Sequence, residues 1–304
     1  MTSQERKVLF FGVGSVGSVY LYLLSKIVST TAVCRSNYDV VKERGFTINS
    51  TVFGDGLHVA PHVDPHPFDY VILTCKVVPG IYPKIIKPVI TPGHTVIALL
   101  QNGIGIEEEY ATAFPENPIL TVATYCATAL GPPGVVTHKE VEKLEVGSYP
   151  SSAPNTRAQA FISLMQSTGA TATLFDDVQV KRWYKLLLNS SWNLICALTL
   201  SLDVQFMQSS DGATDFVLDV MLETRDIAKA YGYEIATEEV KAQWERATEE
   251  PSMLQDLKAG RKREVEAIVG NVVRMARAKC VACGTLDTIY LLMKALDARM
   301  GGNK

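Results

Sequence analysis

Short, continuously apolar runs alternate with helix-length patterns along the first half of the chain. Runs of this kind are typical of strands in a parallel sheet, which are buried on both faces beneath helices. We expect strands at Lys7–Phe11, Thr31–Cys34, Tyr70–Thr74, Thr95–Leu100 and Ile119–Ala123. Their alternation with helical segments predicts a doubly wound α/β fold.

The pattern changes after Gly131-Pro-Pro-Gly134, where two alternating stretches follow. Val135–Lys139 and Lys143–Gly147 are expected to form an antiparallel pair that extends the sheet. A helix from about Thr156 to Ser167 and a last strand at Thr171–Phe175 complete this half.

The second half has a purely helical pattern, which starts after Asp176. The expected helices are Val178–Leu198, Thr214–Tyr231, Thr237–Thr248, Arg261–Lys279 and Thr285–Met300. A chain of 304 residues exceeds what one hydrophobic core usually supports. We therefore predict an α/β domain over residues 1–176 and an all-α domain over residues 177–304.

Composition excludes several functional classes. Hydrophobic residues make up 47% of the chain, and its net charge is −3, so a basic surface for nucleic acid is not expected. No apolar run reaches the roughly 18 residues that span a bilayer. The polar start of the chain does not resemble a secretory signal, and we expect a cytoplasmic protein without membrane partners.

Cysteine and histidine spacing gives little support for a metal. Cys280 and Cys283 form the single CxxC pair, with no second pair to complete a zinc site. His58, His62 and His66 recur every fourth residue, but interleaved prolines break the helix that would align them. We expect a solvated loop there and no metal site.

A glycine motif follows the first predicted strand and opens an apolar helix. In Gly12-Val-Gly14-Ser15-Val16-Gly17, the first glycine suits a tight turn and the second a close approach to a pyrophosphate. The third allows the helix to pack closely, and the helix N-terminus then faces the phosphates. This context predicts a Rossmann-type dinucleotide site; a tight turn without a ligand is the alternative.

Arg35 follows the second predicted strand, where NAD-binding proteins usually carry a carboxylate. A guanidinium at this position can form paired hydrogen bonds with a 2′-phosphate, which favours NADP over NAD. The alternative is an ordinary exposed arginine.

Polar residues that could carry chemistry occur in both halves. Lys76 and Asn102 follow the third and fourth strands, where such folds bind ligands. Lys185, Asn189 and Asn193 are spaced i, i+4, i+8, which places them in one row on a helix. A lysine beside an apolar wall could protonate a ketone oxygen, whereas a solvated helix edge is the alternative.

Further on, Ser252 and Glu264 add a hydroxyl and a carboxylate, although a glutamate in a basic stretch is often only an ion pair. With these residues the chain resembles the ketopantoate reductase family over nearly its whole length. The resemblance rests on the glycine motif, Arg35, Cys75-Lys76, Gln101-Asn102-Gly103, Gly131-Pro-Pro-Gly-Val-Val-Thr-His138, Trp183-Tyr-Lys185, Asn189, Asn193, Ser252-Met-Leu-Gln-Asp256 and Glu264.

The resemblance implies NADPH-dependent reduction of 2-dehydropantoate to (R)-pantoate. It implies that Lys185 is the general acid and Glu264 its partner, and that Asn102 contacts both cofactor and substrate. It further implies cofactor contacts for the loop residues Gly12, Gly14, Ser15, Val16 and Gly17, for Arg35 and for Lys76, and substrate contacts for Asn189, Asn193 and Ser252.

Two positions depart from the family pattern, because Glu249 and Asp203 stand where the family carries asparagines. An added carboxylate near the site would repel an acidic substrate, so a D-2-hydroxyacid dehydrogenase with another 2-oxoacid substrate is an alternative. A non-catalytic NADPH-sensing module is a second alternative, from another functional class. The family includes monomers and dimers, and the apolar stretch Leu291–Ala295 is expected to belong either to the core or to a homodimer interface.

Overall fold

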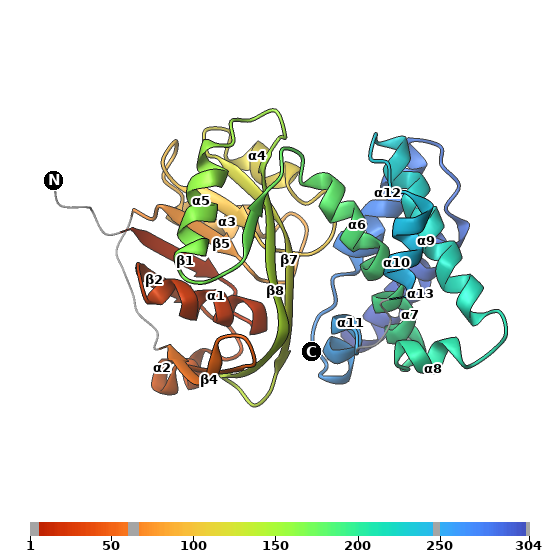
Figure 1. Cartoon of the computed structure of the whole chain (residues 1–304), viewed down its shortest axis with the longest axis horizontal. Coiled ribbons are helices and arrows are strands. Elements are labelled where there is room, and N and C mark those ends of the chain that lie inside the picture. The colour runs from red at the N-terminus through yellow and green to blue at the C-terminus, as the bar shows by residue number, and fades with distance from the viewer. Residues whose placement is uncertain (1–5, 60–66, 246–249, 302–304) are drawn as a thin grey trace. The chain divides into compact units, whose positions relative to one another are not determined.

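The computed structural model describes residues 6–59, 67–245 and 250–301. These residues divide into two compact units (Figure 1). Unit 1 comprises residues 1–75, 80–101 and 107–178, and unit 2 comprises residues 76–79, 102–106 and 179–304. The two short segments that follow the third and fourth predicted strands therefore belong to the helical unit.

Unit 1 is built on a sheet with the strand order β2-β1-β5-β6-β7-β8-β3-β4, in which β9 also pairs with β8. The five strands predicted first are present as β1 (Lys7–Phe11), β2 (Ser29–Val33), β5 (Tyr70–Leu73), β6 (Val96–Leu99) and β7 (Ile119–Leu130). Neighbours among these five strands pair in parallel. The predicted α/β fold with a Rossmann-type sheet is confirmed.

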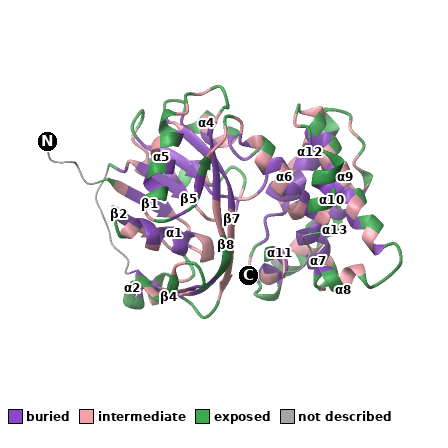
Figure 2. Cartoon of the chain, viewed as in Figure 1, coloured by how far each residue is buried: buried purple, intermediate pink, exposed green. Residues whose placement is uncertain are grey.

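Helices cover the sheet of unit 1, and their apolar sides fill its core. They are α1 (Ser15–Ser25), α2 (Tyr38–Arg44), α3 (Tyr82–Ile86), a 3₁₀ turn at Lys87–Val89, α4 (Glu108–Ala113) and α5 (Thr156–Gln166). Figure 2 shows the sheet interior and the inner side of α1 as buried. Val8, Phe10 and Ile72 on the central strands pack in the same core as Tyr20, Leu23 and Leu24 on α1.

One predicted pair of strands is wrong, because Val135–Lys139 and Lys143–Gly147 belong to one strand. This strand, β8 (Val135–Tyr149), pairs antiparallel with β7 along its length. The residues between the two stretches include no glycine, proline or asparagine that would form a turn. The chain instead shifts register there, because Cys126 pairs with Glu142 whereas Thr128 pairs with His138.

Two further strands of unit 1 were not predicted: β3 (Phe46–Ser50) and β4 (Gly54–Val59), an antiparallel pair. The loop prediction is therefore wrong for His58, which lies in β4. His62 and His66 lie outside the described residues. The helix at Thr156 and the last strand are confirmed, the latter as β9 (Ala172–Leu174).

Unit 2 is helical throughout its described residues. Its elements are α6 (Gln179–Ser190), α7 (Trp192–Thr199), α8 (Asp203–Met207), α9 (Ala213–Ala230), α10 (Thr237–Trp244), α11 (Ser252–Lys258), a π-helical turn (Glu266–Gly270), α12 (Asn271–Ala278) and α13 (Gly284–Gly301). A single core that includes Trp183, Leu187, Val220 and Val272 joins them.

Two of the predicted long helices are interrupted. The expected helix Val178–Leu198 breaks at Ser191, whose backbone leaves the helical region at φ −106°, ψ −83°. Its hydroxyl donates to the Leu187 carbonyl at 2.6 Å, a local bond of the kind that bends helices. The expected helix Arg261–Lys279 starts only after Glu264, and its first turn is π-helical.

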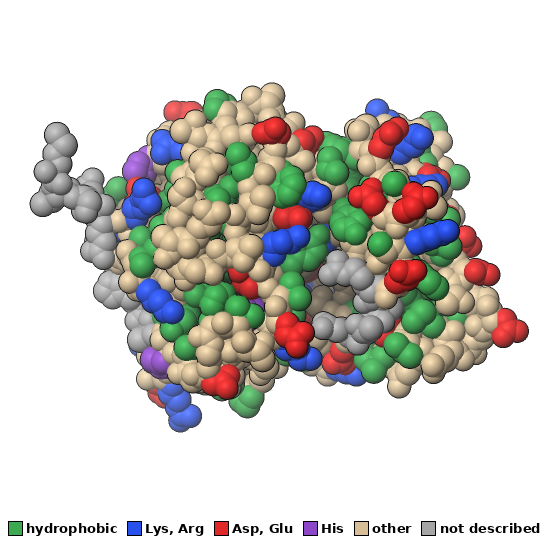
Figure 3. Space-filling model, in the orientation of Figure 1, with side chains coloured by type: hydrophobic (Ala, Val, Ile, Leu, Met, Phe, Trp, Pro, Cys, Tyr) green, Lys and Arg blue, Asp and Glu red, His purple; other side chains and the backbone are tan. Residues whose placement is uncertain are grey.

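The surface agrees with the composition. On the face drawn in Figure 3, basic and acidic side chains are interspersed among the described residues, without one continuous basic area. Over the same part of the chain, none of the helices has both the length and the apolar character needed to span a bilayer.

Candidate active site

The glycine loop of unit 1 has the geometry that the motif predicts. Gly12 has φ +81°, and a Cβ there would lie 2.2 Å from the Cβ of Cys75. A Cβ on Gly17 would lie 2.4 Å from Oγ1 of Thr74, so this glycine lets α1 pack against the end of β5. At Gly14 an added Cβ would meet no protein atom within 4 Å. The first and third glycines are therefore required by the fold, and the second is not.

The end of β2 is tied to this loop. The side-chain amide of Asn37 donates to the backbone carbonyl of Val13 at 3.2 Å. Arg35, two residues earlier, is exposed, and its own carbonyl accepts a hydrogen bond from the Tyr38 amide. The bond from Asn37 therefore holds the glycine loop next to the end of β2. Ser15 and Val16 of the loop lie in the first turn of α1.

Asn102 lies in unit 2 because the segment 102–106 is bound to the helices there. Gly103 has φ +96°, and a Cβ at this position would lie 2.3 Å from the carbonyl oxygen of Ala267. The Gly103 carbonyl accepts from the buried guanidinium of Arg182 at 2.6 Å, and the Ile104 carbonyl accepts from Asn271 at 2.6 Å. These contacts fix the backbone beside Asn102.

Lys185, Asn102 and Glu264 form one chain of hydrogen bonds. The Lys185 ammonium donates to Oδ1 of Asn102 at 2.9 Å, and Nδ2 of Asn102 donates to Oε2 of Glu264 at 3.3 Å. Glu264 is only 4% exposed, and its Oε1 accepts from the Val77 amide at 3.1 Å. The Glu264 carboxylate therefore joins residues 77 and 102 directly and Lys185 through Asn102.

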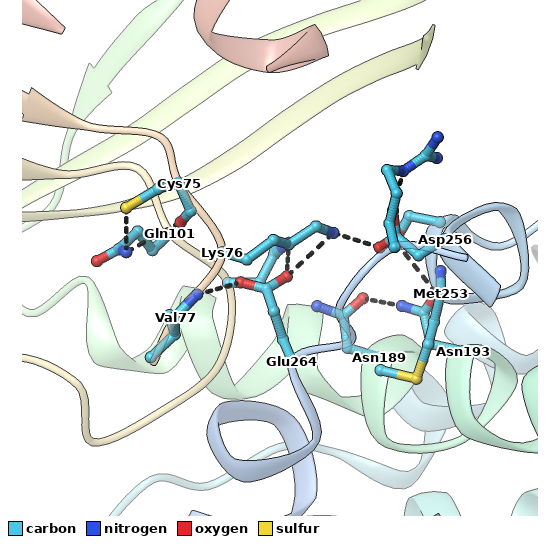
Figure 4. Close-up of polar contacts among 12 residues, drawn as sticks. Cys75, Lys76, Val77, Gln101, Asn189, Asn193, Met253, Asp256 and Glu264 are labelled. Carbon is cyan, nitrogen blue, oxygen red and sulfur yellow. Dashed lines mark hydrogen bonds and ion pairs between the residues drawn. The ribbon is translucent and has the colours of Figure 1, made fainter. Parts of the chain in front are cut away.

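Lys76 extends this chain toward a second carboxylate (Figure 4). Its ammonium lies 2.5 Å from Oδ2 of Asp256 and 3.5 Å from Oε2 of Glu264. Nε of Arg261 donates to the other oxygen of Asp256 at 2.9 Å. Burial lowers the pKa of Lys76, but the charges of Glu264 and Asp256 outweigh burial and raise its pKa overall. Lys76 is therefore charged throughout the neutral range.

Asp256 and Arg261 are site residues that the sequence did not single out. In the sequence Asp256 is only the last residue of a motif that matches the family, and an acid on a short helix carries no signal of its own. What identifies it is burial, since its side chain is 8% exposed while it pairs with two cations. The only signal for Asp256 in the sequence is that it lies four residues after Ser252, one helical turn away.

Asn189, Asn193 and Ser252 form a second polar group in unit 2. Nδ2 of Asn193 donates to Oδ1 of Asn189 at 2.8 Å. Oδ1 of Asn193 accepts from the Ser252 hydroxyl at 3.3 Å and from the Met253 amide at 3.1 Å. The predicted single helical row is corrected here, because Asn193 lies on α7 and Lys185 and Asn189 lie on α6.

Of the two departures from the family pattern, Asp203 is described and Glu249 lies outside the described residues. Asp203 is the first residue of α8 and is 4% exposed, and its Oδ1 accepts from the Val204 amide at 2.6 Å. Burial raises the pKa of Cys196 to about 12, and the charge of Asp203 adds to that rise.

Within the described residues, no group of three or more His, Cys, Asp or Glu side chains could hold a metal ion.

A doubly wound sheet with a glycine loop, joined to a helical unit that carries a lysine–amide–carboxylate chain, defines a two-domain protein of the Rossmann type. Two family models match the chain: "Ketopantoate reductase PanE/ApbA" over residues 8–151 and "Ketopantoate reductase PanE/ApbA C terminal" over residues 177–297. The chain belongs to the ketopantoate reductase family, which is a family of oxidoreductases.

Individual relatives agree with this assignment. A 2-dehydropantoate 2-reductase from Nostoc sp. is 26% identical over 97% of this chain and 96% of its own length. The crystal structure of 2-dehydropantoate 2-reductase from Methylococcus capsulatus is 30% identical, with a TM-score of 0.83 over 97% of both chains. D-Mandelate dehydrogenase, solved with NADH and anilino(oxo)acetate, shares the fold at 22% identity and a TM-score of 0.87, over 97% of this chain and 99% of its own.

Proposed function

We propose that this protein is an NADPH-dependent 2-oxoacid reductase that converts 2-dehydropantoate to (R)-pantoate. The observation that carries the proposal is the chain from the Lys185 ammonium through Asn102 to the buried carboxylate of Glu264. Reduction of a ketone needs a proton donor at its oxygen. An ammonium oriented by an amide oxygen, and backed by a buried carboxylate, meets that need.

The glycine loop supports a dinucleotide cofactor for residues 1–176. Open space above Gly14 allows a pyrophosphate to approach the backbone, and the N-terminus of α1 favours its negative charge. In the proposal the loop from Gly12 to Gly17 holds the pyrophosphate and the exposed Arg35 pairs with the 2′-phosphate. The reduced nicotinamide would supply the hydride to the substrate carbonyl carbon.

The charges of residues 177–304 and of the segments beside them suit an acidic substrate. Lys76 pairs with Asp256 and Glu264, Arg261 pairs with Asp256, and the Lys185 ammonium donates to Asn102. In the proposal these three cationic groups attract the carboxylate of a 2-oxoacid. In the proposed reaction Lys185 gives a proton to the carbonyl oxygen and regains one from solvent, while Glu264 and Asn102 hold it in place.

Substrate identity is tested with a panel of 2-oxoacids and NADPH. The panel contains 2-dehydropantoate, simple aliphatic 2-oxoacids and benzoylformate, the last because D-mandelate dehydrogenase shares the fold. We expect the highest kcat/KM with 2-dehydropantoate. A preference for benzoylformate or another oxoacid would favour a D-2-hydroxyacid dehydrogenase, and no turnover with any of them would contradict a reductase.

The proton donor is tested by Lys185→Ala. We expect kcat to fall by a factor of about 10² to 10⁴ with little change in NADPH affinity, since the lost group acts on the transition state. Lys229→Ala is the matched control, because its ammonium is exposed and lies 3.9 Å from its carboxylate neighbour Glu234. Equal kcat values for the two variants would remove Lys185 from the mechanism.

A further inference from the structure

Glu264 occupies an irregular part of unit 2, the stretch of residues 261–264 between α11 and the π-helical turn. The backbone of this stretch belongs to neither a helix nor a strand. The Glu264 side chain is nevertheless held beside Val77 and Lys76 (Figure 4). In an irregular stretch, side-chain contacts must supply the rigidity that a helix obtains from its backbone hydrogen bonds.

Arg263, the residue before Glu264, ties this stretch to α13. Its side chain is only 4% exposed, and its Nε and Nη2 both contact Oδ1 of Asp297, Nε at 2.7 Å. Its Nη1 donates to the backbone carbonyl of Arg261 at 3.2 Å. Because a guanidinium is planar, its bonds to a carboxylate fix direction as well as distance. One buried side chain thus connects the backbone of residues 261–264 with the last helix.

Glu266, two residues after Glu264, is also held by α13. Its Oε1 accepts from the Lys294 ammonium at 2.8 Å and from the Tyr290 hydroxyl at 3.1 Å, and its Oε2 accepts from Arg274 at 2.8 Å. Burial raises the pKa of Glu266, but the hydrogen bonds from Lys294, Arg274 and Tyr290 outweigh burial and lower its pKa overall. Glu266 is therefore ionised at neutral pH.

The contacts of α13 allow only one register. Lys294 and Asp297 lie one helical turn apart on the same side of α13. They have opposite charges, and each pairs with the opposite charge, Lys294 with Glu266 and Asp297 with Arg263. If the stretch slid by one turn along α13, Arg263 would approach Lys294, and two like charges would repel. The two pairs therefore fix the backbone on both sides of Glu264.

We infer that α13 positions the Glu264 carboxylate, with Arg263 and Asp297 as the positioning residues. Without this pair, residues 261–264 lose their buried attachment, and the carboxylate no longer stays within hydrogen-bond distance of Asn102 and Val77. The inference rests on the proposed function for its effect on turnover, but the position of the carboxylate does not depend on that function.

The kinetic test replaces both charges with apolar side chains, in R263M/D297M. This leaves no unpaired buried charge, a replacement that is often neutral for stability, so we expect thermal unfolding close to that of the wild type. Since a misplacement of about 1 Å can lower a rate about 100-fold, we expect kcat to fall about 5- to 50-fold. The KM for NADPH should stay within about threefold.

The matched control is R277M/D287M, which removes another ion pair of α12 and α13, at 2.7 Å, outside residues 261–266. It should keep the wild-type kcat. An unchanged kcat in a folded R263M/D297M, or an equal fall in the control, would overturn the inference and leave the reductase proposal intact.

A mutant cycle with Glu264→Ala separates positioning from a general loosening of unit 2. In the Glu264→Ala background there is no carboxylate to position, so R263M/D297M should lower kcat no further. A general loosening would lower kcat by the same factor in both backgrounds. Additive losses would therefore overturn the inference.

The backbone amide of Val77 reports the position of the carboxylate without turnover. It donates to Oε1 of Glu264 at 3.1 Å, and Val77 is 6% exposed. With ¹³C-carbonyl lysine and ¹⁵N-valine, only the valines that follow a lysine give a correlated signal. The sequence has two, Val77 and Val8, and Val8 on the central strand β1 serves as the reference for global opening.

Hydrogen exchange of these two amides completes the test. Relative to Val8, we expect Val77 to exchange about tenfold faster or more in R263M/D297M and at the wild-type rate in R277M/D287M. No change in R263M/D297M would overturn the inference. So would rapid exchange of Val77 in the wild type, even if R263M/D297M did not fold or no 2-oxoacid were reduced.

Discussion

The glycine loop of unit 1 and the polar cluster of unit 2 represent two different ways of building a site. In the proposed cofactor site, the backbone of six consecutive residues, Gly12 to Gly17, would provide the binding surface. In the cluster, the Lys76 ammonium, the Val77 backbone amide and the Asn102 side chain contact the carboxylate of Glu264, and Lys185 is linked to it through Asn102. The first site is local in sequence and the second is not.

This difference has a physical cause. A backbone site depends on which φ values and close approaches are allowed, and glycine reports both directly. A side-chain site depends on burial and on which partners satisfy each buried polar group, neither of which a single stretch specifies. We therefore expect substitutions in the loop to impair folding or cofactor binding, and substitutions in the cluster to impair catalysis.

The largest expected effect is on folding at the loop. Gly12→Ala combines a positive φ with a contact of 2.2 Å to Cys75, and it should lower the free energy of unfolding by about 2–5 kcal/mol. Gly14→Ala has open space and ordinary φ, so it should fold normally and yet bind NADPH more weakly. Thermal unfolding and NADPH fluorescence titration measure the two effects. Normal NADPH binding by Gly14→Ala would argue against a phosphate at this turn.

In the cluster, Glu264→Gln should affect catalysis more than folding. The glutamine keeps an oxygen for the Val77 amide but presents NH₂ toward Lys76 and Asn102, where an acceptor is needed. Since hydrogen bonds to charged groups are worth about 1.5–3 kcal/mol, kcat/KM should fall about 10- to 150-fold. Steady-state kinetics beside a thermal unfolding curve checks this. A kcat/KM at the wild-type level would show that the carboxylate charge is not needed.

A smaller and more selective effect is expected at the end of β2. Arg35→Asp should weaken NADPH binding about 10- to 100-fold and leave NADH binding nearly unchanged, because only NADPH carries a 2′-phosphate. Arg44→Asp, at the exposed end of α2, has the same charge change and is the control. Comparable losses for both cofactors would place the phosphate elsewhere.

The smallest effect concerns pH and Lys76. Its pKa is raised above the ordinary value of 10.5, because Glu264 and Asp256 outweigh burial. A base with a raised folded pKa stabilises the protein below its unfolded pKa, and this stabilisation is lost as pH rises through the folded pKa. The difference in unfolding free energy between the wild type and Lys76→Met should therefore be constant between about pH 6 and pH 9. A slope in that window, measured by urea unfolding at several pH values, would contradict the charge assignment.

In the fold, too, some elements could be predicted from their own residues and others could not. The parallel strands β1, β5 and β6 were predictable because each is almost entirely apolar. The continuity of β8 was not, since a register shift near Val141 replaces the expected turn. The break at Ser191 was not predictable either, because a serine inside an apolar helix can bond the preceding turn without ending the helix.

By itself the sequence determined the α/β and helical halves, the glycine loop, the family resemblance and the residue types available for chemistry. Only the tertiary structure decided that Asp256 pairs with Lys76, that Asn102 connects Lys185 with Glu264, and that Asn193 donates to Asn189. Apolar periodicity and glycine geometry are local properties that each segment carries with it. The partners of a buried polar group are set by segments distant in sequence, and they exist only once the helices have packed.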